Sequence, residues 1–261
     1  MVKKDTKKSV SESLETTPEF LPYLPELIAD LWALGSSPEL YIDMLKSLQL
    51  DLEKMVALDL GCGKGAVSIA FAKEFRMKVV GIDACAPFLE EAKKKAIQHQ
   101  VQDLCKFYLA DIRDFVETAI DYDLVIYASL GNVLGKLAEC VRKLRSTVKV
   151  GGHMLIDDGF LKKSDSVSKK GYEHYTSHLK TIEQLTSFGD VLVKEEILSD
   201  QMNRDINDFY LQSIKKRSKI LLQTMPELKE QITGYVQNQE LECEFIDQYT
   251  SGAAWILQRM S

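Results

Sequence analysis

The feature that most constrains this chain is an apolar stretch that runs directly into a cluster of glycines. Residues 55–60 read MVALDL, residues 61–65 read GCGKG, and a helix-like segment, AVSIAFAKEF, follows. Glycine tolerates positive φ and lets a ligand lie against bare backbone, and the N-terminus of the following helix presents unpaired N–H groups. The order of strand, glycine turn and helix therefore predicts one unit of an α/β fold with a ligand site at the turn.

Beyond this turn, strand-like and helix-like segments alternate. The further expected strands are KVVGID, CKFYLAD, YDLVIYA and GGHMLIDDG, followed by a sixth at DVLVKEEIL and a last at AAWILQRM. Apolar strands separated by helices indicate a mostly parallel sheet that is covered on both faces. The pattern predicts a doubly wound α/β fold.

Helical or polar segments flank this core. Residues 1–18 carry charges and hydroxyl groups without an apolar stretch, so we expect a disordered tail there. We expect residues 19–261 to form a single domain. Within it, residues 19–50 should be an N-terminal helical cap. Residues 200–245 should be a helical insertion between the sixth and seventh strands that acts as a lid or binding surface.

Composition limits the partners. The net charge is −6 and the pI is about 5.4, which makes nucleic acid an unlikely substrate. The five cysteines are scattered without a CxxC pair, which favours reduced thiols and a cytoplasmic location. No apolar run approaches the ~18 residues that a membrane helix requires. His174 and His178 fall on an expected helix over residues 172–187, but with no third ligand assigned, we expect no metal.

Acidic residues follow the strands at informative places. Asp59 stands two residues before the first glycine, where a carboxylate would repel a pyrophosphate but suits a cationic sulfonium ligand. Asp83 ends the second strand, where it could accept two hydrogen bonds from a ribose diol. Asp111 ends the third strand and could accept from the exocyclic amine of adenine, with Ile112 packed on the ring. Asp111 could equally cap the next helix, and one carboxylate could do both.

The segments VALDLGCGKG, VVGIDA, LADI and DLVIYASLG resemble motif I, the acidic residue after it, motif II and motif IV of class I, Rossmann-like S-adenosylmethionine-dependent methyltransferases. The resemblance covers about residues 50–160. It implies a seven-stranded sheet with an antiparallel last strand beside the sixth. It also implies S-adenosylmethionine as the cofactor, with S-adenosylhomocysteine as the product. The cofactor-binding residues expected are Asp59, Gly61, Gly63, Gly65, Asp83, Ala84, Asp111, Ile112 and Tyr127.

The acceptor site is less well defined by the sequence. Residues 127–132 contain neither an (N/D)PPY motif nor a Pro-Cys nucleophile, which points to a small-molecule acceptor. Asp157 and Asp158 end the fifth strand and are the candidate catalytic residues. They could deprotonate an acceptor, hold an amine or bind a divalent metal, or they could lie in a solvated turn. The further candidate acceptor contacts are Ser129, Tyr172 and Tyr175.

The expected function is methyl transfer by in-line displacement to an unidentified small-molecule acceptor, in which orientation and exclusion of water supply most of the rate. Three alternatives stay open. The chain could bind the cofactor without catalysis as a regulatory protein, or it could methylate RNA or protein. A nicotinamide-dependent reductase that uses GCGKGA is the third, and Asp59 argues against it. The acceptor atom and the oligomeric state are not predicted.

Overall fold

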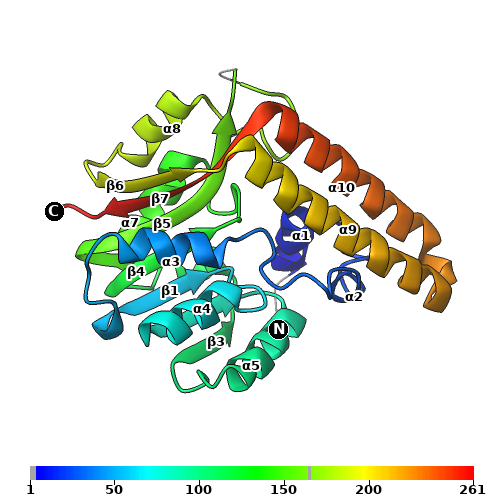
Figure 1. Cartoon of the computed structure of the whole chain (residues 1–261), viewed down its shortest axis with the longest axis horizontal. Coiled ribbons are helices and arrows are strands. Elements are labelled where there is room, and N and C mark those ends of the chain that lie inside the picture. The colour runs from blue at the N-terminus through cyan, green and yellow to red at the C-terminus, as the bar shows by residue number, and fades with distance from the viewer. Residues whose placement is uncertain (1–3, 164–165) are drawn as a thin grey trace.

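The computed structural model describes residues 4–163 and 166–261, and a seven-stranded sheet forms its centre (Figure 1). The strand order is β3-β2-β1-β4-β5-β7-β6. β7 pairs antiparallel with both β5 and β6, whereas β1 to β5 pair in parallel. The mostly parallel sheet with an antiparallel last strand beside the sixth is therefore confirmed. The strands are β1 (Val56–Leu60), β2 (Lys78–Asp83), β3 (Cys105–Leu109), β4 (Tyr122–Ala128), β5 (Val148–Leu161), β6 (Val191–Ile197) and β7 (Thr250–Gln258).

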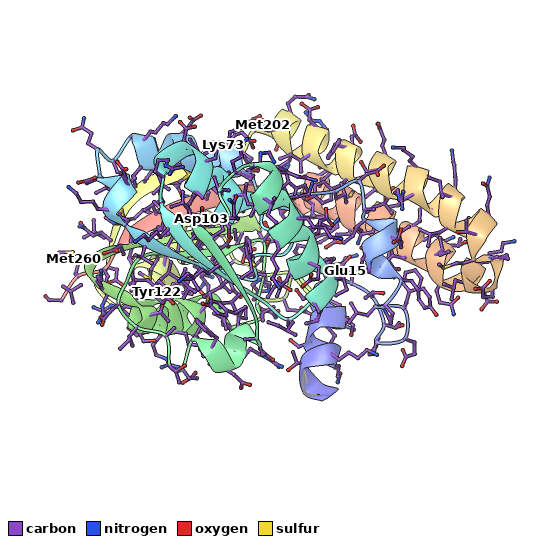
Figure 2. All side chains as sticks on the ribbon, turned by 90° about the horizontal axis from the view of Figure 1, so that it is seen from below. Glu15, Lys73, Asp103, Tyr122, Met202 and Met260 are labelled. Carbon is purple, nitrogen blue, oxygen red and sulfur yellow. The ribbon has the colours of Figure 1, made fainter. Side chains whose placement is uncertain are left out.

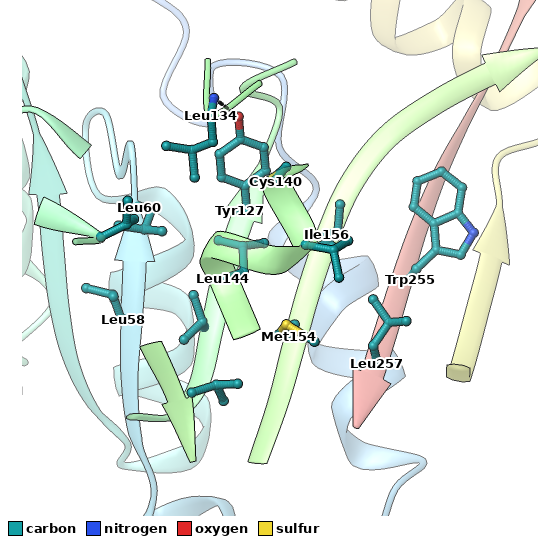
Figure 3. Close-up of a cluster of buried hydrophobic side chains, with 14 of the residues drawn as sticks. Leu58, Leu60, Tyr127, Leu134, Cys140, Leu144, Met154, Ile156, Trp255 and Leu257 are labelled. Carbon is teal, nitrogen blue, oxygen red and sulfur yellow. Dashed lines mark hydrogen bonds between the residues drawn. The ribbon is translucent and has the colours of Figure 1, made fainter. Parts of the chain in front are cut away.

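Helices cover both faces of the sheet because its central strands present apolar side chains on both sides. One face packs against α7 (Leu137–Thr147) and α8 (His178–Leu185), and Figure 3 shows Leu58, Ile156 and Trp255 in that core. The opposite face packs against α3 (Pro38–Lys46) and α4 (Ala66–Phe75). Full burial of an aliphatic side chain contributes about 1.5–3 kcal/mol, so these two layers fix the sheet. The remaining helices are α1 (Lys4–Ser13), α2 (Leu24–Leu27), α5 (Ala86–Gln98), α6 (Ile112–Phe115), α9 (Asp200–Thr224) and α10 (Lys229–Tyr249).

The N-terminal segment differs from the disordered tail expected for residues 1–18, of which 1–3 lie outside the described residues. α1 is a ten-residue helix, and Thr6 and Ser11 on it are buried. An isolated helix of this length is marginal in water, and the segment offers little apolar patterning. Tertiary contacts stabilise it instead, since Leu14 packs against the apolar cluster that includes Ile214 and Ile232.

The insertion between β6 and β7 is an antiparallel pair of long helices, α9 and α10, that extends beyond the carboxyl ends of the parallel strands (Figure 1). α9 is tied to the N-terminal segments by ion pairs between Lys216 and Asp30 at 2.6 Å and between Arg217 and Glu26 at 3.0 Å. Within the described residues, neither of these helices nor any other combines the length and apolar composition needed to span a bilayer.

The helix at α8 is shorter than the sequence pattern predicts. The helix predicted over residues 172–187 begins only at His178, so residues 172–177 form a loop that crosses the end of β5. His174 and His178 therefore do not lie one helical turn apart. His178 pairs with Glu195 at 2.8 Å, whereas the His174 side chain is buried beside Asp158. Long-range packing along β5 overrides the local helical pattern here.

Candidate functional site

A cavity opens at the carboxyl edge of the sheet, where β1, β2 and β4 end. Its volume is about 1030 Å³ with the open mouth included. Ligands of open α/β sheets bind at this edge. The residues that line the cavity from the strand ends and the turns after them are Asp59, Gly61, Cys62, Gly63, Lys64, Asp83, Ala84, Cys85, Asp111, Ile112, Ala128, Ser129 and Leu130.

The three strand-end acids singled out in the sequence meet at this one cavity. Asp59, Asp83 and Asp111 all line it, although they come from separate strands. Parallel strands place their carboxyl ends at a common edge, which is why residues far apart in the chain converge here. Their convergence was expected from the strand order, while their part in holding a cofactor stays a prediction.

The glycine turn after β1 forms the floor of the cavity. Gly61, Gly63 and Gly65 have φ values of 65°, 52° and 75°, a region that other residues rarely adopt. A Cβ atom on Gly61 would collide with the side chain of Leu130. Gly65 is not among the cavity-lining residues. It begins α4, and a Cβ atom there would lie 2.9 Å from Ala92 Cβ, so its role is packing between helices.

Asp83 braces this turn. Its carboxylate accepts hydrogen bonds from the backbone N–H of Gly63 at 2.8 Å and from that of Cys85 at 2.7 Å. Burial raises the pKa of Asp83, and these backbone donors oppose that rise. The carboxylate thus joins the end of β2 to the glycine turn and retains lone pairs that could face a ligand.

Asp59 lies deeper than Asp83. It is almost fully buried and accepts a hydrogen bond from Ser68 Oγ at 2.5 Å. Burial raises the pKa of Asp59 to about 7, with the Ser68 hydrogen bond acting in the opposite direction. A cationic ligand nearby would favour the charged form of such a carboxyl.

Asp111 caps α6. Its carboxylate accepts from the backbone N–H of Arg113 at 2.9 Å and from Thr6 Oγ1 at 2.6 Å. Burial raises the pKa of Asp111, but the hydrogen bonds from Arg113 and Thr6 outweigh it and hold the pKa at about 2. The helix-cap role considered for Asp111 is therefore observed, and Ile112 beside it lines the cavity.

The end of β4 is arranged differently from the sequence expectation. Tyr127 does not line the cavity. Its hydroxyl donates to the carbonyl of Gly131 at 2.9 Å and accepts from Leu134 N–H at 3.2 Å, so it shapes the loop after β4. Ser129 does line the cavity, at a positive φ of 57°, and its N–H donates to the Asp157 carbonyl at 3.0 Å.

The two candidate catalytic acids lie within β5, not in a solvated turn. Because successive side chains of a strand point to opposite faces, Asp157 meets the Tyr41 hydroxyl whereas Asp158 meets the Tyr175 hydroxyl. Burial raises the pKa of Asp157 to about 7, the Tyr41 hydrogen bond lowers it, and the Asp158 charge adds to the rise. Neither acid lines the cavity, and neither do Tyr172 and Tyr175.

Sequence reasoning missed the wall that closes the cavity. This wall comes from α1 and the segment after α2. It was missed because the first was expected to be disordered and the second only to be a cap. Spacing of Thr6, Val10 and Leu14 by four residues was the available signal, but it is short and weakly apolar. The missed lining residues are Thr6, Ser9, Val10, Ser13, Leu14, Trp32, Ala33, Leu34 and Ser36.

Comparison with known proteins gives the family. The family model for the methyltransferase domain matches residues 51–188, more than half of the chain. A ribosomal protein L11 methyltransferase from Enterobacter sp. (strain 638) is 30% identical over 128 residues, which cover 49% of this chain and 41% of the relative. One from Shewanella sp. (strain ANA-3) is 32% identical over 124 residues, covering 47% of this chain and 39% of the relative. The chain thus matches less than half the length of these curated relatives.

Solved structures share the whole fold. A methyltransferase from Geobacter sulfurreducens, described as S-adenosylmethionine-dependent and solved with S-adenosyl-L-homocysteine, has a TM-score of 0.77 at 16% identity, covering 90% of this chain and 97% of its own. YjhP from E. coli has a TM-score of 0.77 at 15% identity, covering 90% and 98%. This chain belongs to the class I, Rossmann-like S-adenosylmethionine-dependent methyltransferases. That assignment decides against the nicotinamide-dependent reductase.

Within residues 4–163 and 166–261, no group of three or more His, Cys, Asp or Glu side chains is arranged to hold a metal ion.

Proposed function

We propose that the chain transfers a methyl group from S-adenosylmethionine to a small-molecule acceptor by in-line displacement. The observation that carries this proposal is the meeting of Asp59, Asp83 and the glycine turn at one cavity on the carboxyl edge of the sheet. In a member of this family, that combination is a site for a cationic nucleoside. The transfer itself and the nature of the acceptor are what the experiments below test.

The residues present fit the cofactor. Gly61 and Gly63 hold the turn at positive φ, Asp59 offers a buried carboxyl to the cationic methionine part, and Asp83 offers hydrogen-bond acceptors to a ribose. We assign the methionine part to Asp59 and the glycine turn, and the ribose to Asp83 and Ala84. Ile112 and Asp111 would hold the adenine. Tyr127 would act indirectly, by shaping the loop after β4.

When bound, S-adenosylmethionine would supply an activated methyl group to the lone pair of the acceptor, and the electron pair of the carbon–sulfur bond would stay on sulfur. The protein has to align the two reactants and exclude water, which can account for most of the rate. α1 and Leu34 cover the cavity and would exclude water from it. Ser129 lies on the β4 side, where an acceptor would enter.

A small acceptor is favoured because helices surround the carboxyl edge. α1 and residues 32–36 line the cavity on one side and leave it partly enclosed, whereas a protein or nucleic-acid chain needs an open groove. Protein methylation is the second candidate, since the curated relatives are named for ribosomal protein L11. They match over less than half of their length, so their acceptor specificity is not carried over to this chain.

Isothermal titration calorimetry with S-adenosylmethionine, S-adenosylhomocysteine and NADH tests the cofactor. We expect both sulfur nucleosides to bind and NADH not to bind. Binding of NADH alone, or of none of the three, would overturn the proposal.

Transfer is tested with cofactor labelled in the methyl group and an extract separated by size. Label recovered in the fraction of small molecules supports the proposal. Label in ribosomal protein supports the second candidate. Tight cofactor binding without transfer to either fraction would identify a non-catalytic binding protein.

A further inference from the structure

Beside the cofactor cavity lies a group of acids that are paired with tyrosines. Tyr41 donates its hydroxyl hydrogen bond to Asp157 and Tyr175 donates to Asp158, both on β5. On α10, Glu242 accepts from the Tyr172 hydroxyl at 2.5 Å. Asp157 and Asp158 point to opposite faces of the sheet, and Tyr172 and Tyr175 pack against each other on the Asp158 side. We call the second and third pairs the tyrosine–carboxyl cluster. Within the described part of the chain, none of its acids is in an ion pair with a lysine or arginine.

A third acid, Glu15, extends the cluster. Gln239 donates through Nε2 to Glu15 at 2.7 Å and to Glu242 at 3.1 Å, so one amide bridges the end of α1 to α10. Figure 2 shows Glu15 at the end of α1. Burial, and next the hydrogen bond with Glu242, raise the pKa of Glu15 to about 9, while the Lys169 charge opposes that rise. Lys169 lies over the Phe245 ring at 5.7 Å.

The consequence is a local shortage of positive charge. Buried carboxylates are costly unless a cation or several donors compensate them. Tyrosine hydroxyls and an amide supply hydrogen bonds but no charge. A ligand ammonium placed among these acids would restore the balance, and aromatic rings attract such a cation through their faces. Tyr172 packs against Phe245 at 4.9 Å and against Tyr175 at 5.1 Å, measured between ring centroids.

His174 is an independent observation that points to a ligand site at the cluster. Its side chain is only 7% exposed, and neither ring nitrogen has a hydrogen-bond partner among residues 4–163 and 166–261. Nε2 faces Asp158 Oδ2 at 3.6 Å, beyond hydrogen-bond distance, and the ring rests edge-on against Tyr175. An unpartnered buried polar group is destabilising, and a catalytic role or a bound water or ion is among the explanations for such a group in a native structure.

The cluster borders the cofactor cavity on the β4–β5 side. Ser129 lines the cavity, and its N–H donates to the Asp157 carbonyl at 3.0 Å. Leu14 also lines the cavity, and Glu15 follows it directly. A molecule among these acids would therefore be a neighbour of the cofactor, on the side away from Asp83.

We propose that the tyrosine–carboxyl cluster is the acceptor site, that it takes a primary or secondary amine, and that His174 accepts the amine's proton. The proposal rests on the proposed function. The acids hold the ammonium form of the acceptor. One N–H bond then breaks, its proton passes to Nε2 of the neutral imidazole, and its electron pair stays on nitrogen as the lone pair that methylation requires. Asp158 faces the resulting imidazolium, which later releases its proton to water.

The experiment uses the full chain saturated with S-adenosylhomocysteine and three probes of one shape: benzylamine, benzyl alcohol and phenylacetate. Calorimetry measures their dissociation constants, and NMR follows the ring titrations of the four histidines, with His174 identified by its absence in H174N. We expect benzylamine to bind at least about tenfold more tightly than either other probe. Benzylamine should also move the His174 titration to lower pH, because an ammonium nearby disfavours the imidazolium.

Two variants separate the cluster from its surroundings. Asp158→Asn and Glu242→Gln should each weaken benzylamine binding by about tenfold and leave the affinity for S-adenosylhomocysteine unchanged. The matched controls are His178→Asn and Glu240→Gln, which alter a histidine paired with Glu195 and an α10 acid paired with Lys215. Both controls should bind benzylamine like the wild type. If a cluster variant fails to fold, the titration of His174 in the wild type still decides.

Equal binding of benzylamine and benzyl alcohol, or a His174 titration that benzylamine does not move, would overturn the amine site. The methyltransferase proposal would survive that result as long as S-adenosylhomocysteine binds. Benzylamine binding to a chain that fails to bind S-adenosylhomocysteine would overturn the proposed function, and with it the role of the cluster as an acceptor site.

Discussion

At the residue scale, the cofactor cavity depends on carboxyls that organise the backbone around it. Asp83 accepts from the N–H groups of Gly63 and Cys85, and so couples the turns after two neighbouring strands. Asp59 is bound to Ser68 and Asp111 to Arg113 and Thr6. Each acid therefore shapes the cavity through hydrogen bonds within the chain.

Replacing Asp83 by Asn is expected to weaken S-adenosylhomocysteine binding by about tenfold to a hundredfold. In the variant, the amide nitrogen, which is a donor, would face a backbone N–H that now donates to a carboxylate oxygen. Such a loss of a hydrogen bond costs about 1–3 kcal/mol. Calorimetry measures the change. Asp103→Asn is the matched control, because Asp103 is exposed on the loop before β3 (Figure 2). Equal affinities of the two variants would contradict the role of Asp83.

Glu15 predicts a pH dependence of stability. Its pKa is raised by burial from 4.5 to about 9, so the folded state binds the proton more tightly than the unfolded state. The resulting stability is complete below about pH 4.5 and is lost as the pH rises through about 9. The groups that act on Glu15 are Glu242 and Gln239 on α10 and Lys169 in the loop before α8.

The variant Glu15→Gln stays neutral and should lack this slope. Its melting temperature should match that of the wild type near pH 5 and exceed it by on the order of 4 °C at pH 8.5. Differential scanning calorimetry across this range measures both. The control variant Glu240→Gln changes an α10 acid that is paired with Lys215, and its melting temperature should follow that of the wild type at every pH. A parallel fall of Glu15→Gln and wild type would assign the slope to other groups.

At the scale of elements, α1 forms one wall of the cavity. Thr6, Val10 and Leu14 line it, and the Thr6 hydroxyl is bonded to Asp111 at the adenine end of the proposed site. Leu14 packs against the cluster of α9 and α10 at the other end. Because the α1 segment is held at both ends, a ligand that enters or leaves the cavity must either displace this helix or pass beside it.

Removal of residues 1–13 should raise the dissociation rate constant of S-adenosylhomocysteine by at least about tenfold. The reason is that a wall of the cavity is lost while the glycine turn is kept. Stopped-flow fluorescence of Trp32, which lines the cavity, can follow release. Thr6→Val, which removes only the hydroxyl bonded to Asp111, should produce a smaller increase of roughly fivefold. An unchanged rate in both would show that α1 does not limit release.

At the scale of the whole molecule, the two faces of the sheet have different tasks. The face that packs against α7 and α8 is a continuous apolar core (Figure 3), and it reaches the cavity only at its carboxyl end, through residues such as Ile112 and Leu130. The carboxyl edge carries the cavity, α1 and the α9–α10 pair. Binding energy at the edge should therefore leave the α7–α8 layer unaffected.

Hydrogen–deuterium exchange tests this separation. S-adenosylhomocysteine should slow exchange in α1 and in residues 61–66, because it orders the segments that contact it. α7 and α8 should exchange at the same rate with and without ligand. Protection spread evenly over the chain would mean that the ligand stabilises the fold globally and that the edge is not an independent unit.

Local sequence patterns account for the sheet and for the side of the cavity that the strand ends form. The run from Val56 to Gly65 encodes a strand, a turn that needs positive φ, and a helix start, and each of these depends on neighbours in the chain. Asp59, Asp83 and Asp111 follow from the rule that parallel strands end at one edge. That Tyr127 lies outside the cavity lining could not be foreseen, because strand alternation does not say which face the cavity occupies.

The sequence by itself determined the order of strands and helices, the family and the acids at the cavity, because each rests on residues that are close in the chain. Only the tertiary structure decided that α1 forms a wall of the cavity, that Tyr41 meets Asp157 and that the His174 side chain is buried beside Asp158. The bond from Thr6 to Asp111 joins residues 105 positions apart, and the one from Gln239 to Glu15 joins residues 224 apart. Contacts of that separation form when packed elements bring distant segments together, and no local periodicity reports them.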